Sequence, residues 1–321
     1  MASREAMKPA PCVALLSEVL DMQYLTDAFE QACPGIDLRL GADLGRLADI
    51  DVAVCWFPPH GLLAQLPQLK LVQSLAAGID HIIADPALPR ALPLCRVVDA
   101  TMAAGMKAYV SWAVVQQQRH MDAYVASSAA SRWEELPFVN PRRHRVGIAG
   151  LGHLGTACAA TLATMGYPVR GWSRSAKGEL PEGATAFHGE GQLDEFLSGC
   201  DTLVCLLPLT PQTRGFLNAE LFAKLPRGAH LINVGRGDHL VEADLLPALD
   251  SGHLSAATLD TFSQEPLPPS HPFWGDPRIL ITPHIATRTD SSVIAQQTLA
   301  NLASLQHGQR PVHQVDLSRG Y

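Results

Sequence analysis

The sequence has no cysteine pair spaced Cys-x-x-Cys and no His-x-x-x-His pattern, so neither common spacing favours a metal site. Its seven cysteines are odd in number, and most lie within apolar runs, which predicts reduced core thiols in a cytoplasmic protein. No apolar run is long enough to cross a bilayer, and the first residues lack the apolar region of a signal peptide. We therefore expect a soluble, cytoplasmic protein with no metal and no membrane partner.

An excess of basic residues is also missing. Lys and Arg total 24 against 31 Asp and Glu, giving a net charge of −7, which argues against nucleic acid as the main partner. The 321 residues are 47% hydrophobic and 17% charged, values typical of a globular enzyme large enough for two domains with separate cores.

One glycine-rich stretch stands out from this background. Residues 146–155 read Val-Gly-Ile-Ala-Gly-Leu-Gly-His-Leu-Gly, in which Gly150, Gly152 and Gly155 form Gly-x-Gly-x-x-Gly between an apolar run and a helix-like segment. In a dinucleotide-binding turn the first glycine permits the tight bend, the second admits the pyrophosphate, and the third lets helix and strand pack closely. The amide groups at the helix start favour phosphate. The stretch predicts a dinucleotide site.

Apolar segments alternate with helical segments on both sides of this turn. We predict strands at 12–17, 70–75, 94–98, 145–150, 168–172, 201–207, 229–234, 256–260 and 279–282. Helices are predicted at 21–33, 102–128, 153–165, 192–198, 217–225, 241–251 and 288–307. This rhythm predicts an α/β fold of two doubly wound parallel-sheet domains, one flavodoxin-like and one of Rossmann type. We expect a discontinuous substrate domain, 1–101 plus 286–321, and an NAD(P)-binding domain, 102–285.

The end of the strand at 168–172 indicates which nicotinamide cofactor is bound. An acidic residue at this place holds the ribose 2′-hydroxyl of NAD, but the sequence continues Ser173-Arg174-Ser175 without a carboxylate. A guanidinium and two hydroxyls suit a 2′-phosphate, which predicts a preference for NADP(H), with NAD(H) also possible. The alternative is an ordinary solvated basic loop.

Three later strand ends carry residues suited to oxo-acid reduction. Arg236 follows the strand at 229–234, Glu265 follows 256–260, and His284 follows 279–282. Arginine can hold a carboxylate and polarise a carbonyl, histidine can donate a proton, and a neighbouring carboxylate favours imidazolium. Each residue alone has a structural explanation, but ligands bind at the carboxyl ends of such strands. Together they predict a catalytic group.

The chain resembles the D-isomer-specific 2-hydroxyacid dehydrogenase family over nearly its whole length. The motifs that carry the resemblance are Cys-Trp56-Phe-Pro-Pro, Ser74-Leu-Ala-Ala-Gly-Ile-Asp-His81, Gly-Trp172-Ser-Arg-Ser, Leu206-Leu-Pro-Leu-Thr-Pro, Glu265-Pro-Leu-Pro-Pro and the terminal Gln314-Val-Asp-Leu-Ser-Arg-Gly-Tyr.

The resemblance implies a role for each site residue. It implies Arg236 as substrate anchor, Glu265 as partner of His284, and His284 as proton donor. It implies that the backbone at Ala77 and Gly78 receives the substrate carboxylate and that Trp56 and Trp274 line a small pocket. The cofactor contacts it implies, beyond the three glycines and Ser173, Arg174 and Ser175, are His153, Leu154, Leu207, Pro208, Thr213, Val234, Gly235, Arg236, Asp260 and His284.

The activity implied is NADPH-dependent reduction of a small 2-oxo acid, glyoxylate to glycolate or hydroxypyruvate to D-glycerate, by a homodimer. Two alternatives stay open. One is a dehydrogenase for a bulkier 2-oxo acid, since sequence cannot measure a pocket. The other is a cofactor-sensing, corepressor-like interaction protein, because such proteins can retain the catalytic residues.

Overall fold

The computed structural model describes residues 10–41, 43–176 and 180–317. The chain divides into two compact units, which are described separately. The smaller unit comprises residues 1–101 and 289–321, and the larger unit comprises residues 102–288. Among the described residues, no helix is long and apolar enough to span a membrane.

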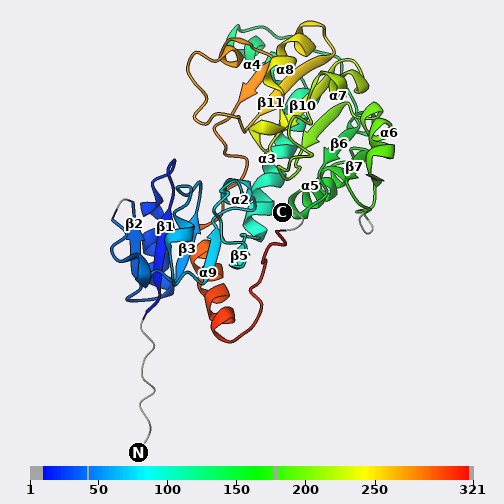
Figure 1. Cartoon of the computed structure of the whole chain (residues 1–321). Coiled ribbons are helices and arrows are strands. Elements are labelled where there is room, and N and C mark those ends of the chain that lie inside the picture. The colour runs from blue at the N-terminus through cyan, green and yellow to red at the C-terminus, as the bar shows by residue number, and fades with distance from the viewer. Residues whose placement is uncertain (1–9, 42, 177–179, 318–321) are drawn as a thin grey trace, which may run out of the picture. The chain divides into compact units, whose positions relative to one another are not determined.

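The smaller unit is built on a five-stranded sheet with the order β2-β1-β3-β4-β5 (Figure 1). Every neighbouring pair is parallel. This is the flavodoxin-like strand order. Successive strands are added on one side of β1 and then on the other, so the order reverses between β1 and β3. The strands are β1 Cys12–Leu16, β2 Asp37–Leu40, β3 Val52–Cys55, β4 Leu71–Ser74 and β5 Leu94–Cys95, and the helices are α1 Thr26–Ala32, α2 Asp80–Ile83 and α9 Ser291–Gln306.

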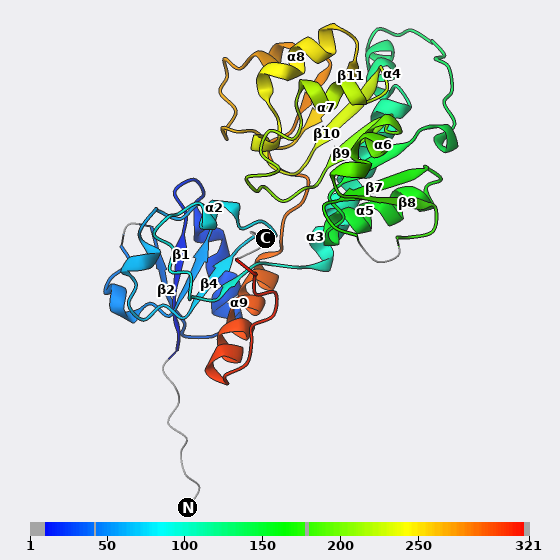
Figure 2. The same cartoon turned by 45° about the vertical axis from the view of Figure 1, so that its right-hand side comes forward.

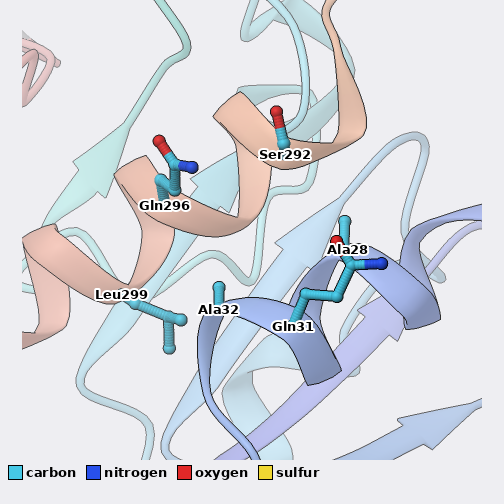
Figure 3. Close-up of a pocket in the computed structure, with 6 residues that line it drawn as sticks. All are labelled: Ala28, Gln31, Ala32, Ser292, Gln296 and Leu299. Atoms are coloured by element: carbon cyan, nitrogen blue, oxygen red, sulfur yellow. The ribbon is translucent and has the colours of Figure 1, made fainter.

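Helices α1 and α9 cover one face of this sheet. Leu15 and Val54 are fully buried there with Phe29 of α1 and Ile294 of α9. Asp290 starts α9 by accepting a hydrogen bond from the Ser292 amide at 2.8 Å. Figure 3 shows a depression between the two helices, lined by Ala28, Gln31, Ala32, Ser292, Gln296 and Leu299. None of the predicted site residues lines it.

The larger unit contains a seven-stranded sheet with the order β12-β11-β10-β9-β6-β7-β8 (Figure 2). All of its pairs are parallel. Counted from β6, its first six strands follow the Rossmann order 3-2-1-4-5-6. The strands are β6 Val146–Ala149, β7 Val169–Ser173, β8 Ala184–His188, β9 Thr202–Cys205, β10 Ala229–Asn233, β11 Leu254–Leu259 and β12 Ile279–Ile281. The predicted fold class, two doubly wound parallel sheets, is confirmed.

The remaining helices are α3 Ala100–Gln118, α4 Met121–Ala129, α5 His153–Thr164, α6 Leu193–Ser198, α7 Ala219–Lys224 and α8 Glu242–Asp250. Short 3₁₀ helices lie at Met22–Leu25, Leu47–Asp49, Leu63–Gln65, Pro141–Arg143, Glu190–Gln192, Gly237–His239 and Pro272–Gly275.

Two details of the larger unit differ from the sequence prediction. The prediction of a single helix at 102–128 is wrong. The helix is interrupted between α3 and α4, where His120 adopts a left-handed φ of 54°. Strand β8 was not predicted, since Ala184–His188 reads Ala-Thr-Ala-Phe-His and buries only Phe187. It lies at the edge of the sheet, where a single neighbour supplies its hydrogen bonds.

The cysteines are free thiols, as their spacing predicts. Six of the seven are buried, and Cys33 is half-buried. Burial raises the pKa of Cys158 and of Cys205 to about 12, which keeps both thiols protonated and unreactive.

Candidate active site

The glycine turn connects β6 to α5 and has the geometry that its sequence requires. Gly150 has a φ of 110°, and a Cβ on it would lie 2.5 Å from the Leu206 carbonyl oxygen. A Cβ on Gly155 would lie 1.8 Å from the Gly150 carbonyl oxygen, so helix and turn pack too closely for any side chain. A Cβ on Gly152, directly before α5, would meet no atom within 4 Å. The start of α5 therefore faces open space in which a pyrophosphate fits, with His153 exposed and Leu154 half-buried beside it.

The residues predicted to choose the cofactor lie at the end of β7. Ser173 is buried, and its hydroxyl donates to the Ser175 carbonyl at 2.9 Å. Arg174 and Ser175 are exposed. No carboxylate follows this strand until Glu179, which lies outside the described residues. A basic group at this place suits a 2′-phosphate better than a 2′-hydroxyl.

The loop after β9 contributes Leu207, Pro208 and Thr213. The Thr213 hydroxyl donates to the Pro208 carbonyl at 2.7 Å and accepts from the Thr210 amide at 2.8 Å, which ties the loop to itself. Leu207 is buried, whereas Pro208 is exposed. Val234, directly after β10, donates its amide to the carbonyl of Cys205, the last residue of β9, at 3.3 Å and so extends the pairing of the two strands to the start of the loop.

Arg236 lies in the loop that follows β10. Its backbone carbonyl accepts a hydrogen bond from Asn233 Nδ2 at 2.9 Å, and its guanidinium donates to the Gly235 carbonyl at 2.8 Å. Asn233 is fully buried, and its Oδ1 accepts from the Gly235 amide at 3.2 Å. A buried amide thus fixes the loop from within, and the arginine is presented from a rigid backbone.

Glu265 and His284 form a hydrogen-bonded pair at the same edge of the sheet. His284 Nδ1 lies 2.9 Å from Glu265 Oε2, and the other carboxylate oxygen accepts from the Phe262 amide at 2.9 Å. His284 has a left-handed φ of 53°, an uncommon conformation for a residue other than glycine. Its amide donates to the Asp260 carbonyl at 2.9 Å, so the backbone as well as the ring is fixed.

The environment of Glu265 acts on its pKa in two directions. Burial raises the pKa, but the hydrogen bond from His284, the charge of His284, the Phe262 amide and the charge of Arg236 lower it by more. The net effect is a lowered pKa, so Glu265 stays ionised near neutral pH. Strands β10, β11 and β12 are neighbours in the sheet, and the loops that follow them bring arginine, glutamate and histidine to one edge.

Asp260 follows β11 and is almost completely buried. Its Oδ1 accepts from Thr282 Oγ1 at 2.6 Å and from the Ile285 amide at 2.8 Å, while its Oδ2 accepts from the Ala286 amide at 2.8 Å. The sequence predicts a cofactor contact for Asp260. Its described contacts hold the loop that carries His284, and its contact with the cofactor stays a prediction.

The tryptophan predicted in this unit is Trp274, on the 3₁₀ helix Pro272–Gly275. Its side chain is exposed, and its indole N–H donates to the Pro268 carbonyl at 2.9 Å. Pro268 belongs to the loop that also contains Glu265. The described contacts thus attach Trp274 to this loop, and its lining of a substrate pocket stays a prediction.

Three predicted substrate contacts belong to the smaller unit. Trp56 follows β3, and its ring centroid lies 4.5 Å from that of His81. Ala77 and Gly78 lie half-buried in the loop after β4, which Ser74 closes by donating its hydroxyl to the Gly78 carbonyl at 2.7 Å. The two groups of predicted substrate contacts are therefore divided between the units, with Arg236 and His284 in the larger one.

Sequence reasoning missed two residues that support the site. His239 is fully buried next to Arg236, and its Nδ1 lies 3.0 Å from the Arg236 amide nitrogen. Tyr109 of α3 shares a hydrogen bond of 2.5 Å with Thr282, which is the residue that donates to Asp260. Neither belongs to a motif, and each acts on backbone or side chains that only the fold brings near. Within the described residues, no cluster of three or more His, Cys, Asp or Glu side chains could hold a metal ion.

Known proteins that are similar to this chain indicate its family. Residues 111–286 match the family model described as D-isomer specific 2-hydroxyacid dehydrogenase, NAD binding domain. A glyoxylate/hydroxypyruvate reductase A of Yersinia enterocolitica is 42% identical over 282 residues, which cover 86% of this chain and 90% of that protein. The sequence motifs that indicate the family are also similar to those of this reductase. The resemblance of the chain to the D-isomer-specific 2-hydroxyacid dehydrogenase family is therefore confirmed.

Two solved structures are similar over almost the full length. A D-isomer specific 2-hydroxyacid dehydrogenase from Xanthobacter autotrophicus, in complex with NADPH and MES, has a TM-score of 0.90 and 40% identity, covering 97% of this chain and 100% of its own. An NADPH-dependent glyoxylate/hydroxypyruvate reductase from Sinorhizobium meliloti, in complex with NADP and sulfate, has a TM-score of 0.90 and 37% identity, with the same coverage. With its Rossmann-type unit and its Arg, Glu and His at one sheet edge, this chain belongs to the D-isomer specific 2-hydroxyacid dehydrogenase family.

Proposed function

We propose that this protein is an NADPH-preferring reductase of small 2-oxo acids, converting glyoxylate to glycolate and hydroxypyruvate to D-glycerate. The observation that carries the proposal is the 2.9 Å pair between His284 Nδ1 and Glu265 Oε2, with Arg236 in the neighbouring loop. The family and the similar reductases support the reaction class.

The residues of the larger unit fit the cofactor. The open start of α5 at Gly152 suits the pyrophosphate, and Arg174 suits a 2′-phosphate. The solved relatives that hold NADPH or NADP support the same choice. We assign the phosphates to the turn 150–155, the 2′-phosphate to Ser173, Arg174 and Ser175, and the remaining contacts to the loops after β9 and β10. When bound, the reduced nicotinamide supplies the hydride that reaches the carbonyl carbon.

The chain's own residues supply binding and the proton. Arg236 holds the carboxylate of the substrate and polarises its carbonyl. With Nδ1 engaged by Glu265, His284 gives its proton from Nε2 to the carbonyl oxygen as the new C–H bond forms. The carboxylate of Glu265 accepts from Nδ1 and fixes the orientation of the ring. Trp56, Trp274 and the backbone at Ala77 and Gly78 complete the substrate contacts in this proposal.

Domain roles follow from the same assignment. The larger unit, residues 102–288, contains the family's NAD binding region and every residue assigned to the cofactor. We infer that the smaller unit supplies substrate contacts. In this assignment the unit boundaries, 101/102 and 288/289, lie within three residues of the domain boundaries drawn from the sequence.

We also propose a homodimer that forms through α3, α4 and the segment after them. Large apolar side chains are exposed there, with Val125 at 69%, Trp133 at 102% and Phe138 at 67%. The segment is ordered against α4, since the Leu136 amide donates to Tyr124 Oη at 2.9 Å. An exposed apolar surface of this kind favours a second copy as partner. Light scattering should give twice the chain mass of 34.5 kDa, and a monomeric mass would overturn the proposal.

Initial rates test the function directly. NADPH and NADH are each supplied with glyoxylate, hydroxypyruvate, pyruvate and bulkier 2-oxo acids. We expect the highest kcat/KM for NADPH with glyoxylate or hydroxypyruvate. Higher values for bulkier acids would instead indicate the larger-substrate dehydrogenase, and no turnover of any 2-oxo acid would refute the proposal.

A further inference from the structure

His239 is a buried histidine whose ring connects two loops of the candidate site. It ends the 3₁₀ helix Gly237–His239 and has no exposed surface. Its Nδ1 lies 3.0 Å from the backbone nitrogen of Arg236, in the loop after β10. Its Nε2 lies 3.3 Å from the carbonyl oxygen of Pro208, in the loop after β9.

The contacts of the ring favour one position for its proton. The Arg236 amide is a donor, so Nδ1 must accept. The Pro208 carbonyl is an acceptor, so Nε2 must donate. Nδ1 also lies 3.2 Å from the Arg236 carbonyl oxygen, so a ring protonated on Nδ1 could donate there, but it would lose the hydrogen bonds to the Arg236 amide and to Pro208. Only the neutral ring with its proton on Nε2 makes both hydrogen bonds. In this form the ring connects a group next to the proposed substrate anchor with a group in the proposed cofactor loop.

The two backbone segments that His239 contacts, at Arg236 and at Pro208, are also held by other side chains. Asn233 Nδ2 donates to the Arg236 carbonyl at 2.9 Å, and Thr213 Oγ1 donates to the Pro208 carbonyl at 2.7 Å. A Cβ on Gly235 would lie 2.9 Å from His239 Nδ1, so the ring packs directly on the backbone beside Arg236. The histidine therefore fills the space between two fixed loops, and its length sets their separation.

We propose that His239 is a positioning residue that holds Arg236 on one side and the cofactor loop on the other, so that its two ring nitrogens separately support binding of the 2-oxo acid and binding of NADPH. This inference rests on the proposed function. The ring touches neither reactant. It acts through the Arg236 backbone on the carboxylate-binding side and through Pro208 on the cofactor side.

Two amide substitutions separate these two actions. In His239→Asn, Oδ1 can take the place of Nδ1 and accept from Arg236, while the donor to Pro208 is lost. In His239→Gln, the amide Nε2 can take the place of the ring Nε2 and donate to Pro208, while the acceptor for Arg236 is lost. Since one neutral hydrogen bond affects an equilibrium by a few-fold to about tenfold, we expect shifts of that size.

Steady-state kinetics with NADPH and glyoxylate then give opposite patterns. His239→Asn should raise the KM for NADPH and leave that for glyoxylate within about twofold. His239→Gln should raise the KM for glyoxylate, or lower kcat, and leave that for NADPH unchanged. Equal changes in both constants for both variants, or no change in either, would overturn the positioning role, because a merely structural histidine gives no such separation.

The matched control is His230→Asn. His230 is also a buried histidine, but it lies near the start of β10, away from the loops of the candidate site. Its Nε2 shares a hydrogen bond of 3.0 Å with Thr258 Oγ1 of β11. This variant should lower the melting temperature without separating the two KM values. A separation as large as that of the His239 variants would count against the proposal.

Two measurements that do not depend on turnover distinguish a failure of this inference from a failure of the proposed function. In the ¹⁵N spectrum of the wild-type protein, the His239 ring should show a protonated Nε2 and an unprotonated Nδ1. Titration with NADPH alone should show weaker binding for His239→Asn and wild-type binding for His239→Gln. The opposite tautomer, or equal affinities in all three proteins, would overturn the inference even if the wild type reduces glyoxylate. Failure to reduce any 2-oxo acid would refute the proposed function alone.

Discussion

Replacement of Glu265 by glutamine removes one charge from the centre of the candidate site and changes little else. The amide oxygen can still accept from the Phe262 amide, as Oε1 does at 2.9 Å. The second position, 2.9 Å from His284 Nδ1, changes from a charged acceptor to a neutral NH2 group, which donates and cannot accept from the ring. His284 thereby loses the hydrogen-bond acceptor that holds its ring, and fewer enzyme molecules present the ring in the orientation needed to donate a proton.

The magnitude follows from the contact and its exposure. A hydrogen bond to a charged group contributes about 1.5–3 kcal/mol. The side chains of His284 and Glu265 are 29% and 36% exposed, so solvent screening places this pair at the lower end of the range. Because about 1.4 kcal/mol corresponds to a factor of ten, kcat for glyoxylate should fall by about tenfold.

The pKa of Glu265 also predicts how the pH matters. The pKa is lowered from its ordinary value of 4.5, so the ionised carboxylate stabilises the folded protein above that pH. This stabilisation is lost as the pH falls through the lowered value. The melting temperatures of wild type and Glu265→Gln should therefore differ at neutral pH and converge in acid.

The assay is NADPH oxidation with glyoxylate at several pH values, accompanied by thermal melts. A matched control is Glu242→Gln, since Glu242 also pairs with a histidine, His271, at 3.3 Å in the same unit. The control should keep kcat near that of the wild type. An unchanged kcat for Glu265→Gln, or an equal loss in both variants, would refute the assignment of Glu265 as the partner of the proton donor.

Two other substitutions test separate parts of the account. Arg174→Ala should raise the KM for NADPH by tenfold or more, since it removes a charged contact to the 2′-phosphate, and should barely change the KM for NADH; an equal loss for both cofactors in steady-state rates would contradict the phosphate assignment. Asp260→Asn should lower the free energy of unfolding by about 2–3 kcal/mol in denaturant titrations, because an amide N–H then opposes the Ala286 amide in a buried place; wild-type stability would show that the carboxylate does not hold the His284 loop.

Much of the fold could be predicted because the strands are short buried runs. The strand at Val146–Ala149 is fully buried, and apolar runs of this kind stand out in a parallel sheet whose two faces are covered. Strand β8 escaped prediction because Phe187 is its only buried residue, and the sequence shows neither an apolar run nor a regular alternation of apolar and polar residues. The break at His120 was also missed, because a left-handed residue other than glycine has no sequence signal.

Some residues of the candidate site could also be predicted from the sequence, and others could not. Arg236, Glu265 and His284 were predicted together because each follows a strand, and neighbouring parallel strands end at one edge. His239 could not be found from its sequence, since its importance depends on the Arg236 amide and the Pro208 carbonyl on either side of its ring. The sequence predicts a cofactor contact for Asp260. Its hydrogen bonds to Thr282 and Ile285 could not be predicted, because they depend on the conformation of the loop 282–286.

The central claim is that His284 delivers the proton during reduction, and single-turnover kinetics of His284→Gln test it most directly. The enzyme is mixed with saturating NADPH and glyoxylate, and NADPH binding is measured separately by titration. We predict a rate of hydride transfer lower by about 10²–10⁴-fold, with NADPH affinity within a few-fold of the wild type. A rate within a few-fold of the wild type would contradict the claim and remove His284 from its assigned role.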